Sequence, residues 1–398
     1  MTATGEEVLA YPFGPVDGLE VDSALAEMCR EQPVLRVRLP FGGDAWLVTR
    51  HADVKTVLSD PRFSRAAAVG EDVPRTIAAG LPSTSMLSMD PPQHSRLRRR
   101  VIRAFTVRRV ESLRPRVQQI VDGLLDTMIA AGSPGDLAKA LTWPLPITVV
   151  CELLGVPITD RDRFTVWVDD LLMLSDPEQA TQAREHLNDY LAGQIARRRV
   201  APTDDLLAAL VTAPDDGDRL NDEDLIGIGV SLLSAGHEAT ANQLGNFVYT
   251  LLTNLELWRK LVAQPGLIPA AVEELSRTIP ISASAGFTRI ATADVELSGR
   301  TIRAGDAVVV EFSMANRDPE VFDHPEVIDF HRRSIPHLAF GYGVHHCLGA
   351  QLARMELRLT LESLIRRLPG LRLAVPAEQL SWRTDRLIRG LDALPVIW

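Results

Sequence analysis

The chain has 398 residues, a formal net charge of −10, 46% hydrophobic residues and 24% charged residues. This is the composition of an ordinary globular protein, and the acidic balance argues against a nucleic acid partner. No linker, repeat or low-complexity tract divides the sequence, so we expect a single domain over residues 1–398. The three cysteines lie far apart, which argues against a disulfide framework and suits the reducing cytoplasm.

Two stretches bear on membrane association. Met1–Phe13 contains no long apolar run with a basic flank, so we expect neither a signal peptide nor a membrane anchor. The apolar run Leu225–Ala235 is too short to span a bilayer. We therefore expect a cytoplasmic protein that binds no membrane.

Helical periodicity dominates the chain, and strand signals cluster in a few places. The expected strands lie in Pro33–Thr49, in Val295–Phe312 and from Leu371 onward. Longer helices are expected at Ser112–Ala131, Glu178–Arg198, Asp222–Thr253 and Cys347–Arg367. The pattern predicts a mainly α fold with small β-sheets.

A strongly basic stretch interrupts the acidic chain between His94 and Arg109. It holds seven arginines and no carboxylate, namely Arg96, Arg98, Arg99, Arg100, Arg103, Arg108 and Arg109. Complementary charge speeds the encounter of two proteins, so the stretch suggests a docking site for an acidic partner. A merely solvated helix face is the alternative.

The helix expected at Asp222–Thr253 has a clear start and an unusual centre. Asn221 is the expected N-cap, and acidic residues follow it at the positive end of the helix dipole. The centre reads Ala-Gly-His-Glu-Ala-Thr from Ala235 to Thr240. A glycine inside a helix costs about 1 kcal/mol relative to alanine, so Gly236 needs a packing or functional reason. We interpret that reason as space beside the helix, with an ordinary core helix as the alternative.

The segment Phe340–Gly349 places one cysteine in an unusual electrostatic setting. Gly341 and Gly343 allow a sharp turn that can lie close to a flat ligand. Cys347 then lies where a helix begins near residue 348. The positive end of a helix dipole lowers the pKa of a thiol, so Cys347 is predicted to bind a metal as the thiolate. No second cysteine lies within a hundred residues, which argues against tetrahedral zinc and favours iron carried by a cofactor.

This segment resembles the cysteine loop of the cytochrome P450 family. The matching positions are Phe340, Gly341, Gly343, His345, Cys347 and Gly349. The resemblance extends from the Pro33 region to Arg389-Gly390-Leu391, and it implies haem b held between a long central helix and the cysteine loop, with Cys347 as the iron ligand. An inert buried cysteine is the alternative.

The same resemblance identifies the centre of the long helix as the oxygen-binding segment, where Ala235 and Gly236 would leave room above the iron. The family commonly places threonine directly after the acid, whereas here Glu238 is followed by Ala239 and then Thr240. One helical step turns a side chain by about 100°, so Thr240 cannot take the missing position. We hypothesise that a substrate hydroxyl or an ordered water completes a proton path, with Glu238 at its solvent-side end.

Glu274 and Arg277 stand three apart on one helix. In the family, such a pair forms a buried network with a later arginine and fixes the cysteine loop. Arg332 and Arg333 both remain candidates for the third member.

The resemblance also implies residues for the haem carboxylates and for the substrate. The carboxylate-binding positions are matched by His94, Arg98, Arg289 and His345. The substrate-lining stretches are Ala66–Met89, Leu171–Glu185, Leu232–Ala235, Ile281–Phe287 and Leu387–Ile388, with Met86, Met89, Leu232, Ala235, Ser282, Ala283 and Ile388 as pocket residues. They are mostly aliphatic or small, which favours a bulky, largely apolar molecule.

The resemblance therefore implies an actinomycete-type P450 monooxygenase. It would insert one oxygen atom from O2 into a C–H or C=C bond of a macrolide, polyene or terpenoid in antibiotic biosynthesis. NAD(P)H would supply electrons through ferredoxin reductase and ferredoxin, and the arginine stretch would receive the ferredoxin. We expect a monomer. Two alternatives remain: oxidative coupling or rearrangement without oxygen insertion, and a non-catalytic haem-thiolate protein.

Overall fold

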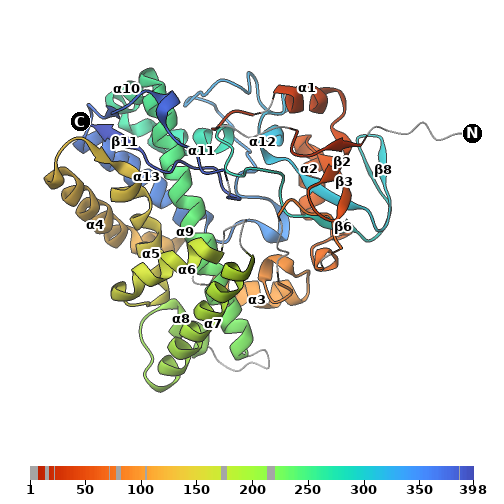
Figure 1. The fold of residues 1–398 in the computed structure, drawn as a ribbon, viewed down its shortest axis with the longest axis horizontal. Coiled ribbons are helices and arrows are strands. Elements are labelled where there is room, and N and C mark those ends of the chain that lie inside the picture. Colours follow the sequence, from red (N-terminus) through yellow and green to blue (C-terminus); the bar gives the residue numbers. More distant parts are fainter. Residues whose placement is uncertain are drawn as a thin grey trace, which may run out of the picture. The chain divides into compact units, whose positions relative to one another are not determined.

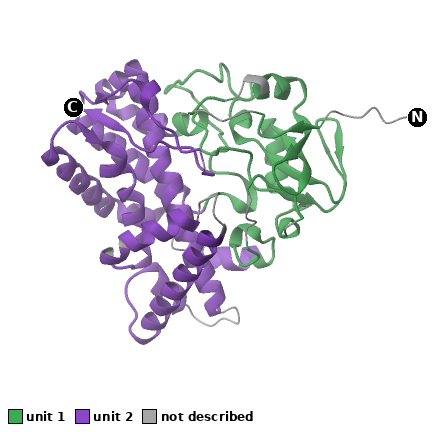
Figure 2. Ribbon diagram, in the orientation of Figure 1, with its two compact units in different colours: residues 1–93, 273–347 green, residues 94–272, 348–398 purple. Residues whose placement is uncertain are grey.

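The structure is a computed structural model that describes residues 8–13, 18–21, 23–70, 72–77, 82–103, 105–171, 177–212, 220–384 and 386–398. The chain divides into two compact units, each built from two separate stretches (Figure 2). Unit 1 comprises Met1–Gln93 and Glu273–Cys347, and unit 2 comprises His94–Val272 and Leu348–Trp398. The single domain over residues 1–398 stays a prediction, and each unit is described by itself.

Unit 1 is organised around a mixed sheet. Its described strands lie in the order β1 (Leu9–Ala10), β2 (Val34–Leu39), β3 (Gly43–Val48), β9 (Ala307–Val310), β6 (Arg289–Ala291) and β4 (Phe63–Ser64). A separate hairpin pairs β7 (Val295–Leu297) with β8 (Arg300–Ile302). These strands confirm the two strand regions that the sequence predicted at residues 33–49 and 295–312.

The sheet forms because apolar residues fill its two faces. β2 and β3 make a hairpin whose register runs from Val34 opposite Val48 to Leu39 opposite Gly43. β9 lies parallel to β3, and its four residues are all buried. The helices of this unit are short: α1 (Ser23–Glu31), α2 (His51–Ser59) and α12 (Phe312–Ala315), together with the end of α11 (Ile268–Thr278), which contains the unit boundary.

Unit 2 is largely helical. Its helices are α3 (Gln93–Ile102, from His94 on), α4 (Val107–Ala131), α5 (Pro144–Leu154), α6 (Arg161–Leu171), α7 (Pro177–Val200), α8 (Leu206–Val211), α9 (Asp222–Thr253), α10 (Leu255–Ala263) and α13 (Ala350–Arg367). A small sheet has the order β10 (Arg372–Leu373), β11 (Pro395–Ile397) and β5 (Gly135–Asp136). The mainly α fold with small sheets is confirmed.

The 32-residue helix α9 crosses unit 2 and is the long green helix of Figure 1. The side chain of Asn221 accepts a hydrogen bond from the backbone N–H of Asp224 at 2.7 Å, and the Asp224 carboxylate accepts one from the Asn221 N–H. This capping box confirms the predicted start of the helix. α5 and α7 pack against α9, so most of its surface is buried.

Two helices begin three or more residues from their predicted starts. α4 starts at Val107 because the side chain of Thr106 accepts from the N–H of Arg109 and caps the helix there. α13 starts at Ala350 with Gly349 as its N-cap, three residues after the predicted start at Cys347. Among the described helices, none has both the length and the hydropathy that a bilayer crossing requires.

Candidate active site

Cys347 differs from the other two cysteines of the chain because its side chain is exposed, whereas Cys29 and Cys151 are buried. Burial raises the pKa of the Cys29 thiol to about 12. A thiol of this kind stays protonated and does not bind metal. Cys151 is a buried core residue of α5. The exposed sulfur of Cys347 is therefore the candidate metal ligand among the three.

The loop around Cys347 is held by backbone hydrogen bonds within unit 1. The N–H of Gly341 donates to the Leu338 carbonyl at 2.8 Å, and the N–H of Cys347 donates to the Phe340 carbonyl at 2.8 Å. Gly341 and Gly343 have φ angles of 71° and 70°. Glycine adopts this left-handed region without strain, so both glycines serve the predicted sharp turn.

Gly343 also has a packing role that the sequence did not reveal. A Cβ on this residue would lie 2.4 Å from the carbonyl oxygen of Leu58, at the end of α2. The glycine is thus required for the loop to approach α2, and this contact gives it a reason other than the predicted flat ligand. By contrast, a Cβ on Gly349 would meet nothing within 4 Å.

The helix that follows the loop begins without a side-chain cap. Gly349 occupies the N-cap of α13, and no side chain bonds to the first N–H groups from that position. Such N–H groups and the positive end of the dipole favour an anion. The chain around Cys347 therefore suits a negatively charged sulfur.

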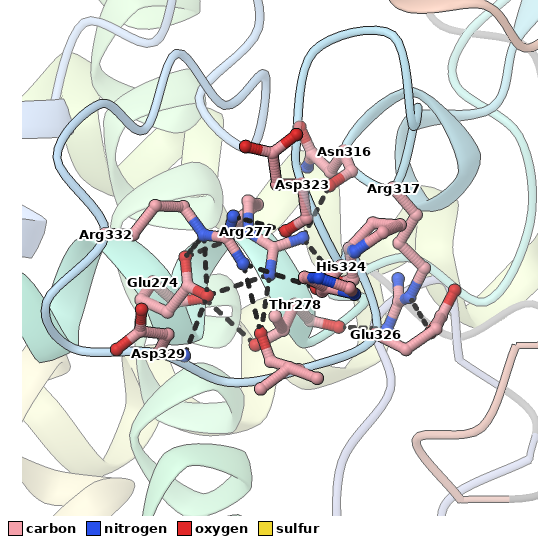
Figure 3. A network of polar contacts seen from close by, with 12 residues as sticks. Glu274, Arg277, Thr278, Asn316, Arg317, Asp323, His324, Glu326, Asp329 and Arg332 are labelled. Carbon is pink, nitrogen blue, oxygen red and sulfur yellow. Dashed lines mark hydrogen bonds and ion pairs between the residues drawn. The ribbon is translucent and has the colours of Figure 1, made fainter.

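Glu274 forms the centre of a buried ionic network in unit 1 (Figure 3). Its carboxylate accepts from Nε and Nη2 of Arg277 at 2.9 and 2.8 Å, and both side chains are 0% exposed. Nε of Arg332 donates to both oxygens of the same carboxylate at 3.2 Å. The structure thus resolves the open choice: Arg332 contacts Glu274.

A chain of hydrogen bonds leads from this network to the cysteine loop. Nη1 of Arg277 donates to the carbonyl of Asn316 at 2.9 Å. The side-chain oxygen of Asn316 accepts from the N–H of Leu338 at 2.6 Å, and the Leu338 carbonyl accepts from Gly341 at 2.8 Å. A buried charge pair therefore supports the loop through three successive contacts.

Arg289 is the buried cation of unit 1 that best fits a carboxylate ligand. Its side chain is 6% exposed, and burial lowers its pKa to about 10. A guanidinium has five N–H donors, yet the hydrogen bond shown here is a single 3.5 Å contact from Nη1 to the Phe287 carbonyl. A protonated, buried guanidinium that has no further hydrogen bond among the described residues fits a haem carboxylate. His345 and Phe340 are partly buried in the cysteine loop.

The predicted pocket residues of unit 1 lie in two segments. Met86 is partly buried, Met89 is buried, and Ser282 and Ala283 are partly buried. Residues 71, 78–81 and 172–176 of the predicted substrate-lining stretches fall outside the described residues. Between the two methionines, the hydroxyl of Ser88 is buried without a hydrogen-bond partner among the described residues, which the sequence did not suggest.

In unit 2, the predicted carboxylate-binding residues lie on α3. His94 is buried and Arg98 is partly buried. The arginines of the basic stretch differ in exposure. Arg100 is buried, and the partly buried Arg96 donates a hydrogen bond to Asp224 at 2.8 Å. The exposed members are Arg99, Arg103, Arg108 and Arg109. The exposed basic surface is therefore smaller than the sequence suggests.

The centre of α9 shows where small residues leave space. Ala235 is exposed and Ala239 is partly exposed, and the four-residue spacing places them on one face with the partly exposed Leu232. A Cβ on Gly236 would lie 3.2 Å from Val150, so this glycine lets α5 pack closely against α9. Gly236 thus has a packing reason on the α5 side, and the space predicted at Ala235 and Gly236 stays a prediction.

The acid and the alcohol of this segment are both buried. Glu238 is 2% exposed, which does not agree with the predicted contact to solvent, and Thr240 is also buried. The imidazole of His237 is buried beside Trp143, and burial lowers its pKa to about 4. His237 is therefore neutral at ordinary pH.

The sequence did not predict that α9 contacts the segment at Arg389 and Gly390. The amide of Asn242 donates to the Glu238 carbonyl at 3.0 Å, and a Cβ on Gly390 would lie 1.7 Å from the Asn242 side-chain oxygen. Asn246 donates to the Arg389 carbonyl at 2.9 Å. These contacts fix the segment that carries Ile388, which is partly buried. Two asparagines four residues apart are too common a pattern to reveal this from sequence.

Among the described residues, no group of three or more His, Cys, Asp or Glu side chains could hold a metal ion. A protein-built zinc or iron cluster of that kind is therefore not found in the described part of the chain. A single sulfur ligand to cofactor-borne iron is compatible with this result.

Comparison with known proteins points to one family. The family model described as "Cytochrome P450" matches residues 170–370. Nocardicin C N-oxygenase of Nocardia uniformis subsp. tsuyamanensis is 52% identical over 398 residues, covering 99% of this chain and 100% of the relative. Mycinamicin IV hydroxylase/epoxidase of Micromonospora griseorubida is 48% identical over 397 residues, covering 99% and 100%.

A solved structure gives the same result at the level of the fold. The LnmA cytochrome P450 hydroxylase from the leinamycin biosynthetic pathway of Streptomyces atroolivaceus S-140 superposes with a TM-score of 0.93. It is 50% identical and covers 98% of this chain and 100% of its own.

The network predicts a large cost for removing the central charge. Glu274→Gln leaves two arginines facing one neutral amide, so we expect a loss of about 3–5 kcal/mol in the free energy of unfolding. The neighbouring Glu273→Gln is the matched control, because Glu273 makes a partly exposed contact with His337 at 3.2 Å. We expect its cost to be below about 1 kcal/mol in urea unfolding. Equal costs for the two variants would contradict the role given to Glu274.

Proposed function

Because the chain belongs to the cytochrome P450 family, we propose that this actinomycete-type monooxygenase oxidises a bulky, mostly apolar natural product at a C–H or C=C bond. One atom of O2 enters the product and the other leaves as water. The observation that carries the proposal is the exposed Cys347 in a loop that precedes the uncapped start of α13. The fold is the P450 fold, and the full-length likeness to a hydroxylase/epoxidase supports the reaction type.

The family implies haem, which supplies the activation of O2 when bound. Cys347 would be the iron ligand. The cationic residues proposed for its carboxylates are His94 and Arg98 in unit 2, and Arg289 and His345 in unit 1. Phe340, Gly341 and Gly349 would lie against the cofactor from the loop, and Ala235 from α9.

The proposed substrate is a macrolide, polyene or terpenoid. The relatives named for mycinamicin IV and nocardicin C support a natural product of antibiotic biosynthesis. Because one relative is named as an N-oxygenase, a test must also include substrates in which a nitrogen atom could accept the oxygen. The residues proposed for the pocket are apolar except for Ser282, which suits a mostly apolar substrate.

The proposed electron donor is a ferredoxin, reduced by NAD(P)H through a reductase. An acidic ferredoxin suits the exposed arginines on α3, on α4 and at Arg103 after the end of α3, because opposite charges speed association. Docking at Arg99, Arg103, Arg108 and Arg109 would make turnover fall steeply with rising salt. We also propose that the enzyme acts as a monomer in the cytoplasm.

Proton delivery is the step for which this chain departs from its family. Ala239 lies on the exposed face of α9 with Ala235, and it offers no hydroxyl there. Thr240 is buried about 100° further around the helix, so it does not replace a hydroxyl on that face. We therefore assign this role to a substrate hydroxyl or an ordered water, with the buried Glu238 behind it.

The reaction type is tested with isotopically labelled dioxygen. Purified enzyme, ferredoxin, reductase and NAD(P)H are combined with macrolide, polyene and amine-bearing candidate substrates, and the masses of the products are measured by mass spectrometry. We expect product that carries one labelled oxygen atom. Consumption of O2 with a coupled or rearranged product that carries no label would instead support the alternative reaction. Binding of haem without reduction by any donor would support a non-catalytic protein.

Substrate-assisted proton delivery makes Ala239→Thr informative. We expect the variant to raise the fraction of electrons that end in product on substrates without a hydroxyl near the oxidised atom, and to change it little on hydroxyl-bearing ones. Ala239→Val is the matched control, because it adds nearly the same volume without the oxygen. A parent enzyme that is already tightly coupled on hydroxyl-free substrates would count against substrate assistance.

A further inference from the structure

Arg65 is a buried arginine at the end of strand β4 in unit 1. β4 pairs with β6 in antiparallel register, with Ser64 opposite Ile290. Continuing this register by one residue places Arg65 beside Arg289, the candidate cofactor cation. The Arg65 side chain is 6% exposed. Burying a guanidinium is costly unless its donors are used, so the contacts of Arg65 need an explanation.

The guanidinium joins two segments that are far apart in the sequence. Nε donates to the carbonyl of Leu87 at 2.8 Å, and Nη1 donates to the carbonyl of Thr288. The guanidinium carbon lies 5.2 Å from the centre of the Phe287 ring, over its face. One side chain thus links the turn that contains Met86 to the segment that leads into β6.

Asp90 fixes the backbone around Arg65. Its Oδ1 accepts from the N–H of Arg65 at 2.8 Å, and its Oδ2 accepts from the N–H of Ala66 at 3.3 Å and from the Ser64 hydroxyl. Asp90 directly follows Met89. The segment that carries the two predicted pocket methionines is therefore held at Leu87 by a side chain and at its end by a carboxylate.

The opposite segment is anchored independently. The hydroxyl of Thr288 donates to the carbonyl of Pro74 at 2.6 Å. Burial of Arg65 is the main reason that its pKa is lowered to about 9, and the positive charge of the adjacent Arg289 is the second reason. Both arginines keep their protons at neutral pH, and Asp90 is the carboxylate that favours both charges. A net positive charge remains here for an anionic ligand.

We propose that Arg65 is a positioning residue that sets the placement of the Met86–Met89 segment relative to Thr288 and Arg289. The inference rests on the proposed function, since it gives the first segment to the substrate and Arg289 to the cofactor. The planar fork of arginine can hold two carbonyl oxygens in fixed directions, whereas a lysine ammonium is a point charge on a flexible stem. The geometry, and not the charge alone, is what Arg65 contributes.

Two nitrogenous ligands of haem iron separate this role from general stability. Imidazole is small and reports on the iron, whereas 4-phenylimidazole also needs room for its ring along the substrate side. In haem-loaded Arg65→Lys, we expect the dissociation constant of 4-phenylimidazole to rise about tenfold and that of imidazole to stay within about twofold of the parent. Both constants are measured by absorbance titration.

The matched control is Arg62→Lys. Arg62 precedes Arg65 by three residues and also reaches a backbone carbonyl, that of Asp294 at 3.3 Å, but it is exposed and paired with Asp60. We expect this variant to leave both constants unchanged. If Arg65→Lys is not recovered folded, Asp90→Asn replaces it as the test. This variant weakens the attachment of the Met86–Met89 segment to the end of β4, so it should shift the ratio of the two dissociation constants in the same direction.

The outcomes distinguish the inference from the proposed function. A parent protein that holds no haem would refute the proposed function. A parent that binds both ligands, with a ratio of constants that Arg65→Lys or Asp90→Asn leaves unchanged, would overturn the inference alone. Equal weakening of both ligands in Arg65→Lys would also overturn it, because a merely structural role would produce that result.

Discussion

The position of the Cys347 sulfur is the constraint on which the rest of the structure depends, because the loop that carries it has no sheet to hold it. Backbone hydrogen bonds from Gly341 and Cys347 close the loop on itself. Gly343 allows it to lie against the end of α2. A buried ion pair between Glu274 and Arg277 then supports it from outside through Asn316.

A buried ion pair is weak evidence for stability in itself, since desolvation offsets much of the attraction. Here the pair matters because the guanidinium donors that Glu274 does not use bond to backbone carbonyls. Arg277 also donates to the carbonyls of Pro325 and Val327, and Arg332 donates to the carbonyl of Asp323. Side chains hold a stretch without regular secondary structure, and that stretch leads to the cysteine loop. We interpret the network as fixing the backbone conformation of this stretch.

The sequence predicted those features that depend on local chemistry. The start of α9 follows from its capping residues. It also led to the pair of Glu274 and Arg277. What it could not predict depends on residues that are distant in the chain: Gly236 is small because Val150 faces it, and Gly343 because Leu58 does. Arg65 has a role only where two remote carbonyls meet.

The most direct measurement of the central claim is the absorption spectrum of reduced, carbon monoxide-treated Cys347→Ser protein beside that of its parent. The account predicts that the parent shows the band of a thiolate-ligated haem and that the variant loses it together with turnover. A variant that retained both the spectrum and the turnover of the parent would contradict it.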